Sequence, residues 1–388
     1  ITDSTNAFIG AGCCNCIDGD SDEETGSTFA SIVGGLSNFI RCGTYAFIGG
    51  GQSNQICDGF NNHAAIVGGR CNSICCSSCG FVGGGYNNKM GTVAILSSIV
   101  GGTSNCIGSG YCCSFIGGGA LNTVNHDRSS IVGGLCNTIT NVDSFIGGGV
   151  SNCTTGADSA IAGGTLNTGS GACGFIGGGC LNQAGGSNSI AVGGSNNSAS
   201  AAHSTIVGGT LNTGSGACSF IGGGCLNNIC SGEIFTFIGG GRQNRVNGDY
   251  TSIVGGYLNC NDNHCAFIGG GYSNYNGGFA GTIGGGYNHE ISLNQSYSAI
   301  LGGYCNKVDA DYGFIGGGCC NCVCMNCSVI VGGRNHLVNS RFSFIGGGCV
   351  NTIDSACWGH AIVMGASSHI CTSTHSNNFI GGGQGNHI

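Results

Sequence analysis

FIGGGQSNQI (residues 47–56) and SIVGGLSNFI (residues 31–40) are two versions of one ten-residue motif that recurs along the whole chain. We count 24 copies in 388 residues. Between Asn122 and Asn227 the step from one motif Asn to the next is 15 residues seven times in succession, and elsewhere it varies from 14 to 23. A short period of this kind predicts a solenoid, in which each motif forms one turn and loops at one edge absorb the changes in length.

The first half of the motif predicts a β-strand with a buried central residue. That residue is Ile in 21 of the 24 copies, and alternate residues of a strand face opposite sides. We therefore expect an all-β protein, a parallel β-solenoid (β-roll) of about 24 turns of ~15–16 residues, forming one continuous domain over residues 1–388. The predicted structural core includes Ile32, Ile48, Ile66, Ile99, Ile116, Ile131 and Ile146.

The Gly-Gly pair and the Asn that follow the strand predict a corner. Glycine is required where φ is positive or where another backbone comes close. Asn tolerates left-handed backbone, and stacked Asn side chains can form an amide ladder. A second short strand follows the Asn and weakens in the middle of the chain, where Thr154, Gly169, Ala184, Ala199 and Gly214 replace Ile or Val. The predicted turn Asn residues include Asn38, Asn54, Asn72, Asn122 and Asn137.

The two motif versions alternate along most of the chain, so two motifs could form one turn of about 30 residues. A near-identical segment occurs at residues 163–182 and 208–227, which is a duplication of 45 residues or three motifs. If a turn held two motifs, this odd number would move the following strands to the wrong sheet. The duplication therefore favours one motif per turn.

The composition excludes several protein classes. Gly is 83 residues and Pro is absent, which excludes collagen. Only nine Lys and Arg residues and a net charge of −8 argue against a nucleic-acid partner. No apolar run approaches the 18 residues of a membrane span. The chain begins with Ile1 and has no capping segment at either end, so we expect either a partial chain or chains that join end to end.

Thirty Cys residues predict that some form disulfides in an oxidising compartment, although Cys also serves as a small buried apolar residue. Cys57 and Cys75 each lie three residues after a motif Asn, and Cys305 and Cys320 each lie one residue before one. Adjacent turns would bring the Cα atoms of such a pair to ~4.8 Å, within the range of a disulfide. These four residues are candidate disulfide partners, within one chain or between chains.

The longest insertion, DGDSDEETG (residues 18–26), is a candidate Ca²⁺ site through Asp18, Asp20, Asp22 and Glu24, or else a solvated acidic loop. CCNCVCMNC (residues 319–327) is a candidate Zn²⁺ or Cu(I) site. Neither matches a complete ligand pattern, so we expect no cofactor. We find no nucleophile, base and acid set and no phosphate loop, and therefore expect no enzyme activity.

Segments such as TSIVGGYLN (residues 251–259) and NNSAS (residues 196–200) resemble the head repeats of trimeric autotransporter adhesins, the YadA-like head. The resemblance covers nearly the whole chain. It implies a left-handed parallel β-roll in which three chains lie side by side. The heptad stalk, neck and membrane anchor of that family have no counterpart here, and the Cys content is foreign to it.

These patterns predict a structural protein, a rigid fibre or filament outside the cell, on a cell surface or on a virus particle. Its main partner would be itself, as a homotrimer or an end-to-end polymer. One alternative is an adhesin or receptor-binding head that contacts a surface receptor or matrix through side chains on one edge. Another is a head-to-tail filament of single chains.

Overall fold

The computed structural model describes residues 1–19, 26–57, 62–354, 361–371 and 377–388. In these residues every regular element is a β-strand, as predicted. The described residues contain no helix that could cross a membrane. The chain divides into two compact units, Ile1–Asn196 and Asn197–Ile388.

Each motif contributes one odd-numbered strand, which contains the central Ile, and one even-numbered strand, which follows the Asn. In the first unit the odd-numbered strands are β1 (Phe8–Ile9), β3 (Ser31–Ile32), β5 (Phe47–Ile48), β7 (Ala65–Ile66), β9 (Phe81–Val82), β11 (Ser98–Ile99), β13 (Phe115–Ile116), β15 (Ser130–Ile131), β17 (Phe145–Ile146), β19 (Ala160–Ile161), β21 (Phe175–Ile176) and β23 (Ile190–Ala191). The even-numbered strands are β2 (Cys16–Asp18), β4 (Phe39–Arg41), β6 (Gln55–Cys57), β8 (Ser73–Cys75), β10 (Lys89–Met90), β12 (Cys106–Ile107), β14 (Thr123–Val124), β16 (Thr138–Ile139), β18 (Cys153–Thr154), β20 (Thr168–Gly169) and β22 (Gln183–Ala184).

The second unit repeats the arrangement. Its even-numbered strands are β24 (Ser198–Ala199), β26 (Thr213–Gly214), β28 (Asn228–Ile229), β30 (Arg245–Val246), β32 (Cys260–Asn261), β34 (Tyr275–Asn276), β36 (Glu290–Ile291), β38 (Lys307–Val308), β40 (Cys322–Val323), β42 (Leu337–Asn339), β44 (Thr352–Asp354) and β46 (His369–Ile370). Its odd-numbered strands are β25 (Thr205–Ile206), β27 (Phe220–Ile221), β29 (Phe237–Ile238), β31 (Ser252–Ile253), β33 (Phe267–Ile268), β35 (Thr282–Ile283), β37 (Ala299–Ile300), β39 (Phe314–Ile315), β41 (Val329–Ile330), β43 (Phe344–Ile345), β45 (Ala361–Val363) and β47 (Asn378–Ile380).

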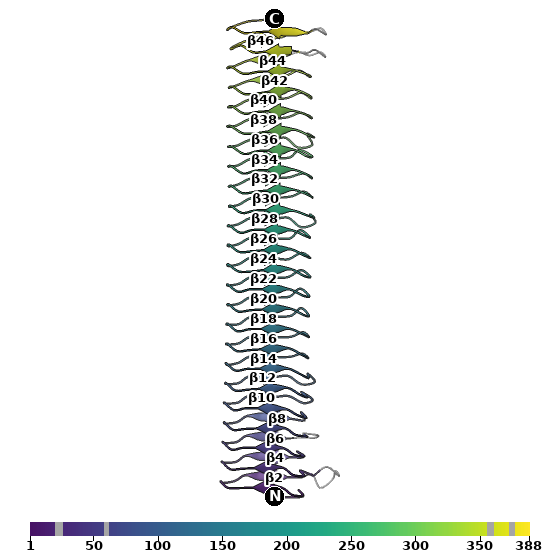
Figure 1. Ribbon diagram of the computed structural model, residues 1–388, viewed down its shortest axis with the longest axis vertical. Helices are drawn as coiled ribbons and strands as arrows, with labels where there is room; N and C mark the ends of the chain where they lie inside the picture. Colours follow the sequence, from purple (N-terminus) through teal and green to yellow (C-terminus); the bar gives the residue numbers. More distant parts are fainter. Residues whose placement is uncertain (20–25, 58–61, 355–360, 372–376) are drawn as a thin grey trace. The chain divides into compact units, whose positions relative to one another are not determined.

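Within each unit, strands of the same kind pair in parallel with those of the next motif. β5 pairs with β7 through Phe47 with Ala65 and Ile48 with Ile66, and β6 pairs with β8 in the same way. Figure 1 shows the strands of the first unit stacked in chain order, from β2 upward. One motif therefore makes one turn, and the alternative of a 30-residue turn is excluded.

The inside of most turns is filled by one apolar side chain from each strand, whereas some even-numbered strands place a polar residue or Gly there, such as Thr154, Gly169 and Asn261. The predicted core residues Ile32, Ile48, Ile66, Ile99, Ile116, Ile131 and Ile146 have no exposed surface. The even-numbered strands contribute a second column of buried residues, such as Ile40, Ile56 and Ile74. The interior is thus two facing columns, about one residue thick per sheet.

The motif Asn residues lie at the corner where the odd-numbered strand passes to the even-numbered one, and they form a buried ladder. The backbone N–H of Asn54 donates to Oδ1 of Asn38 in the preceding turn at 3.0 Å. Nδ2 of Asn54 donates to the carbonyls of Gly50 and Gly69, each at 2.9 Å. The same set recurs at other turns, and Asn38, Asn54, Asn72, Asn122 and Asn137 are fully buried.

Our expectation that the Asn itself has left-handed backbone is wrong, because positive φ falls on the residue before it, such as Ser37 (55°) and Ser53 (56°). The Asn instead points its side chain inward, where its Oδ1 and Nδ2 satisfy the backbone of two turns. The second Gly of the pair also has positive φ, 99° at Gly35 and 93° at Gly51. The corner is therefore made by two positive-φ residues that lie before the Asn and are separated by one residue, such as Gly35 and Ser37 on either side of Leu36.

A second ladder, which we did not predict, lies at the opposite corner and consists mainly of Ser. The N–H of Ser144 donates to Oγ of Ser129 in the preceding turn at 3.2 Å. Oγ of Ser144 donates to the carbonyls of Val142 and Gly156, each at 3.1 Å. Short hydroxyl side chains thus stabilise this corner as the Asn residues stabilise the other.

Candidate interaction surfaces

The outer face of the odd-numbered strands, which we call the apolar face, consists of the two residues that flank the buried central residue of each strand. In the described residues every flanking residue is Phe, Gly, Ser, Ala, Thr, Val, Ile, Leu or Met, with no charged or amide side chain. In the first unit Val33, Val67, Val100 and Val132 are 49–51% exposed, and Phe47, Phe81, Phe145 and Phe175 are 37–41% exposed. These side chains are not covered by any other part of their unit.

The apolar face is also flat. Each outward Phe is followed two residues later by Gly, and a Cβ atom built on Gly49 would lie 3.3 Å from Cε1 of Phe47. The same contact would be 3.2 Å for Gly117 with Phe115. The Phe ring therefore lies over the glycine of its own strand. A Cβ atom at this glycine would also collide with a backbone carbonyl of the next turn, that of Val67 for Gly49, so both contacts favour Gly in the motif.

The outer face of the even-numbered strands is polar by contrast. Its flanking residues include Lys89 and Thr138 in the first unit and Arg245 and Glu290 in the second. Opposite charges meet on adjacent turns, since Nζ of Lys307 lies 2.9 Å from Oε1 of Glu290. This face has the composition expected of a surface in contact with water.

A column of exposed or half-buried Tyr residues, which we call the tyrosine column, runs along one corner of the second unit. The ring centroids of Tyr257 and Tyr272 lie 5.2 Å apart, those of Tyr272 and Tyr287 4.8 Å, and those of Tyr287 and Tyr304 5.0 Å. Cζ of Arg242 lies 5.6 Å from the ring of Tyr257 at one end. Each Tyr occupies the position directly after a Gly-Gly pair, so aligning the motifs would have revealed the column.

The candidate disulfide residues occupy two kinds of position. Cys57 and Cys75 are paired on adjacent even-numbered strands, and their Sγ atoms lie 3.6 Å apart. Sγ of Cys320 lies 3.3 Å from Sγ of the adjacent Cys319, and Sγ of Cys305 accepts a hydrogen bond from Asn288 at 3.4 Å. The structure thus brings Cys57 and Cys75 into contact. Cys305 and Cys320 lie at matching positions of adjacent turns, since the residues before them, Tyr304 and Cys319, pair in parallel.

The cysteine-rich segment 319–327 does not form one cluster. Sγ of Cys322 and Sγ of Cys324 lie 3.1 Å apart on the polar face. A hydrogen bond from Cys322 lowers the pKa of Cys324 to about 7 and raises the pKa of Cys322. Cys327 lies at a different corner, where its N–H donates to the carbonyl of Asp311.

Of the candidate Ca²⁺ ligands, only Asp18 lies within the described residues. Its carbonyl accepts hydrogen bonds from Oγ of Ser27 at 2.7 Å and from the N–H of Cys42 at 3.1 Å. Asp20, Asp22 and Glu24 lie outside the described residues.

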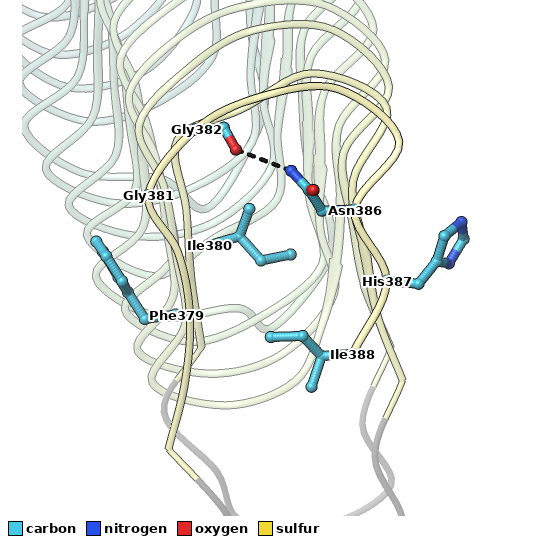
Figure 2. A pocket seen from close by; sticks show the side chains of 7 residues that line it. All are labelled: Phe379, Ile380, Gly381, Gly382, Asn386, His387 and Ile388. Atoms are coloured by element: carbon cyan, nitrogen blue, oxygen red, sulfur yellow. Dashed lines mark hydrogen bonds between the residues drawn. The ribbon is translucent and has the colours of Figure 1, made fainter.

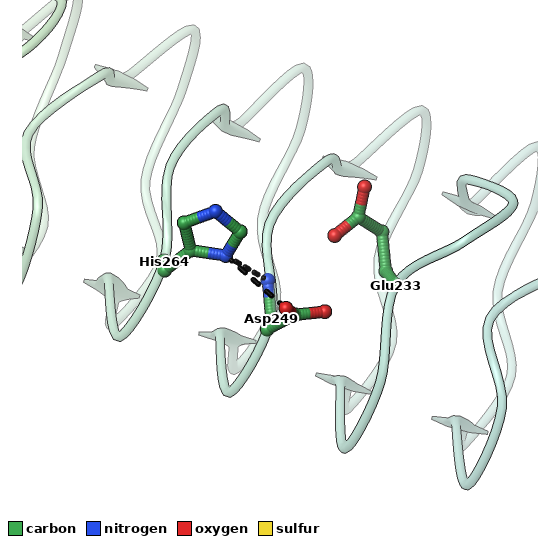
Figure 3. Close-up of side chains that lie close together, drawn as sticks. All are labelled: Glu233, Asp249 and His264. Carbon is green, nitrogen blue, oxygen red and sulfur yellow. Dashed lines mark hydrogen bonds and ion pairs between the residues drawn. The ribbon is translucent and has the colours of Figure 1, made fainter.

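A different group of possible metal ligands, Glu233, Asp249 and His264, lies on successive turns of the second unit, with ligand atoms within 4.8 Å of one another (Figure 3). Oδ1 of Asp249 accepts the N–H of Ile234 at 2.8 Å, and Nδ1 of His264 accepts the N–H of Asp249 at 2.9 Å. Desolvation raises the pKa of Glu233, and the nearby Asp249 carboxylate raises it further. The side chains of Asp249 and His264 thus accept hydrogen bonds from the backbone of the adjacent turn, which accounts for their positions without a metal.

The last described turn has a shallow hollow on one side, shown in Figure 2. Nδ2 of Asn386 donates to the carbonyl of Gly382 across it at 2.8 Å. The lining is the Ile, Gly and Asn set of an ordinary turn, so the hollow is the inside of a turn seen from its end. It is lined by Phe379, Ile380, Gly381, Gly382, Asn386, His387 and Ile388.

Comparison with family models finds no match for the chain, and comparison with curated proteins finds none either. The surfaces described above are therefore interpreted from their own chemistry.

Proposed function

We propose that the chain is a structural protein that builds a rigid fibre or filament outside the cell, at a cell surface or on the surface of a virus particle. The observation that carries this proposal is the Asn ladder. It repeats one set of hydrogen bonds at turn after turn within each unit. A protein in which every turn makes the same contacts with the next can be long and stiff, because each turn resists bending and local opening in the same way.

The mechanism of such a fibre is mechanical. The side chains of the interior have almost no exposed surface, and the Asn side chains hydrogen-bond backbone groups that a protease would need to extract. A buried amide left without its partner costs about 1–3 kcal/mol, so opening one turn is unfavourable at both corners.

The proposed location rests on cysteine and charge. Thirty Cys residues in a chain with nine Lys and Arg residues fit an oxidising environment, in which disulfides could link turns or copies. Side-by-side self-assembly, which the resemblance also implies, would thicken the fibre.

Immunogold labelling of the source cells or particles with an antibody against the purified chain tests this function. We expect gold on fibres or spikes at the outer surface, and regular filaments or elongated particles of the purified protein by negative-stain electron microscopy. Label confined to the cell interior would overturn the proposed location. Compact particles without elongation would overturn the fibre.

The tyrosine column favours a second candidate, a receptor- or matrix-binding head. Four aromatic rings at a spacing of about 5 Å, with Arg242 at one end, form a surface on which planar groups of a ligand could stack. Replacing Tyr272 and Tyr287 by Ser should reduce adhesion of the purified chain to host-cell or matrix preparations at least tenfold. Replacing Phe235 and Tyr250, a stacked pair at another corner of the same unit, provides the control. Equal adhesion of all three proteins would exclude the column as a binding site.

A further inference from the structure

We propose that the apolar face is an interface through which two copies of this chain pack face to face. The inference deepens the proposed structural function by naming the surface and the partner of its side-by-side assembly.

The first argument is composition. In the described residues the flanking positions of the odd-numbered strands hold no charged or amide side chain, while those of the even-numbered strands include Lys89, Arg245 and Glu290. The same turns thus present one polar surface and one apolar surface. A contiguous apolar surface of this extent marks an interaction site on a soluble protein.

The second argument is shape. The Phe rings lie over the glycines of their own strands, and the Val side chains of the intervening turns stand beside them. A flat sheet face is complementary to another flat sheet face, and such faces pack about 10 Å apart.

The third argument is area. Twelve odd-numbered strands in the first unit, at ~4.8 Å per strand and a width of about 10 Å, give a flat area on the order of 600 Å². The second unit also has twelve odd-numbered strands and offers a similar area. Specific interfaces bury about 600–1,000 Å² per partner, so the face of either unit taken alone lies at the lower end of this range.

The occupant that fits best is a second copy of the chain. Its strands repeat at the same spacing, so contacts made at one turn recur at every turn, and one self-complementary face closes as a pair. A lipid surface is less favoured, because membrane-binding faces of this kind usually carry flanking Lys and Arg, whereas this chain has a net charge of −8.

The test compares two double variants of the whole chain. Val100→Glu with Val132→Glu places two carboxylates on the apolar face, two turns apart. Thr138→Glu with Thr168→Glu places two on the polar face of the same unit at the same spacing. All four residues flank a strand's buried residue, and circular dichroism with thermal melting checks that both variants fold as the wild type does.

Mass photometry and analytical ultracentrifugation should give the wild type and the Thr variant twice the mass of one chain. The Val variant should have the mass of one chain, with a dissociation constant raised at least 100-fold. A wild type of one or three chains, or a Val variant that keeps the doubled mass, would overturn the pairing.

Flotation with neutral phosphatidylcholine vesicles examines the lipid alternative. A single-chain wild type that floats with vesicles, and a Val variant that does not, would assign the face to lipid and overturn the pairing. A single-chain wild type that still labels external fibres would overturn the pairing and leave the structural function standing.

Discussion

At the scale of single residues, three described positions in the Asn ladder of the second unit hold another residue: two hold His, at His289 and His336, and one holds Ser368. The N–H of Asn306 donates to Nδ1 of His289 at 3.1 Å, so the imidazole replaces Oδ1 of an Asn as an acceptor. In the described residues Nε2 of His289 has no hydrogen-bond partner and the residue is 1% exposed. Burial lowers the pKa of both His289 and His336, since the charged form is poorly solvated there.

We predict that His289→Asn stabilises the protein. An Asn at this position would donate Nδ2 hydrogen bonds to the carbonyls of Gly285 and Gly303, as Asn274 does to Gly270 and Gly286. Two hydrogen bonds should add about 1–2 kcal/mol at pH 7. Chemical denaturation measures the difference in free energy of unfolding. A lower value for the variant than for the wild type would contradict the claim that Asn side chains stabilise this corner better than His does.

The same variant should change the pH dependence. Because the folded pKa of His289 lies below its ordinary value, the unfolded chain binds protons more readily, and stability falls as pH drops below about 6.5. The loss between pH 7 and pH 5 should be smaller in His289→Asn than in the wild type. His203→Asn, at an exposed corner, serves as the control and should leave the loss unchanged.

The two glycines of one corner should respond differently to substitution. Gly51 has φ of 93°, and a Cβ there would collide with the carbonyl of Gly69, whereas a Cβ on Gly50 would meet no atom within 4 Å. We expect Gly51→Ala to lower the free energy of unfolding by about 2–4 kcal/mol and Gly50→Ala to change it by under about 0.5 kcal/mol. Equal effects in thermal melts of the two variants would contradict this account of the corner.

At the scale of elements, the even-numbered strands of the first unit are thinly filled toward its end. Gly169 takes the place of a core Ile in β20, and a Cβ there would lie 3.6 Å from Cβ of Ser159 and 3.7 Å from Cγ2 of Thr154. These are ordinary contact distances. Gly169→Ala should therefore raise the free energy of unfolding by about 0.5–1 kcal/mol, by filling space and by restricting the unfolded chain. A destabilised variant would show that the column has no room.

Strands β6 and β8 should become covalently linked under oxidation. Cys57 and Cys75 are register partners with Sγ atoms 3.6 Å apart. Oxidised glutathione would accept the two electrons, forming one disulfide and two reduced glutathione molecules. The closed loop predicts about 3 kcal/mol of stabilisation. Peptide mass spectrometry without reductant should detect the Cys57–Cys75 peptide. In thermal melts, reductant should remove this stabilisation from the oxidised wild type and should have no such effect on Cys57→Ser. Absence of the linked peptide would refute the predicted disulfide.

Much of the element arrangement follows from the sequence. The strict Ile column and the 45-residue duplication predict two facing columns and one motif per turn, and the pairing of Ile48 with Ile66 agrees. The Ser ladder was missed because Ser, Ala and Gly share that column, and its role depends on carbonyls of the next turn. Our prediction places the left-handed conformation at the motif Asn, one residue too late. Asn is a common turn residue, but Asn38 points its side chain inward and the residue before it has the positive φ.

At the scale of the whole molecule, the distribution of charge decides how assembly should respond to salt. The chain has only 26 charged residues, and in the described part none flanks the buried residue of an odd-numbered strand. Exposed ion pairs such as Arg128 with Asp143, at 2.7 Å, lie elsewhere and are worth little in water. Association through the apolar face should therefore be hydrophobic, and salt that screens charges should not weaken it.

We predict that the dissociation constant of the pair stays constant or falls between 0.05 M and 1 M NaCl, and falls further in ammonium sulfate. Excluded salts strengthen apolar burial, while screening removes the mutual repulsion of two chains of net charge −8. Sedimentation equilibrium across the salt series measures the constant. A pair that dissociates as NaCl rises would be held by ion pairs instead, which would place the contact on the polar face with Lys89 and its neighbours.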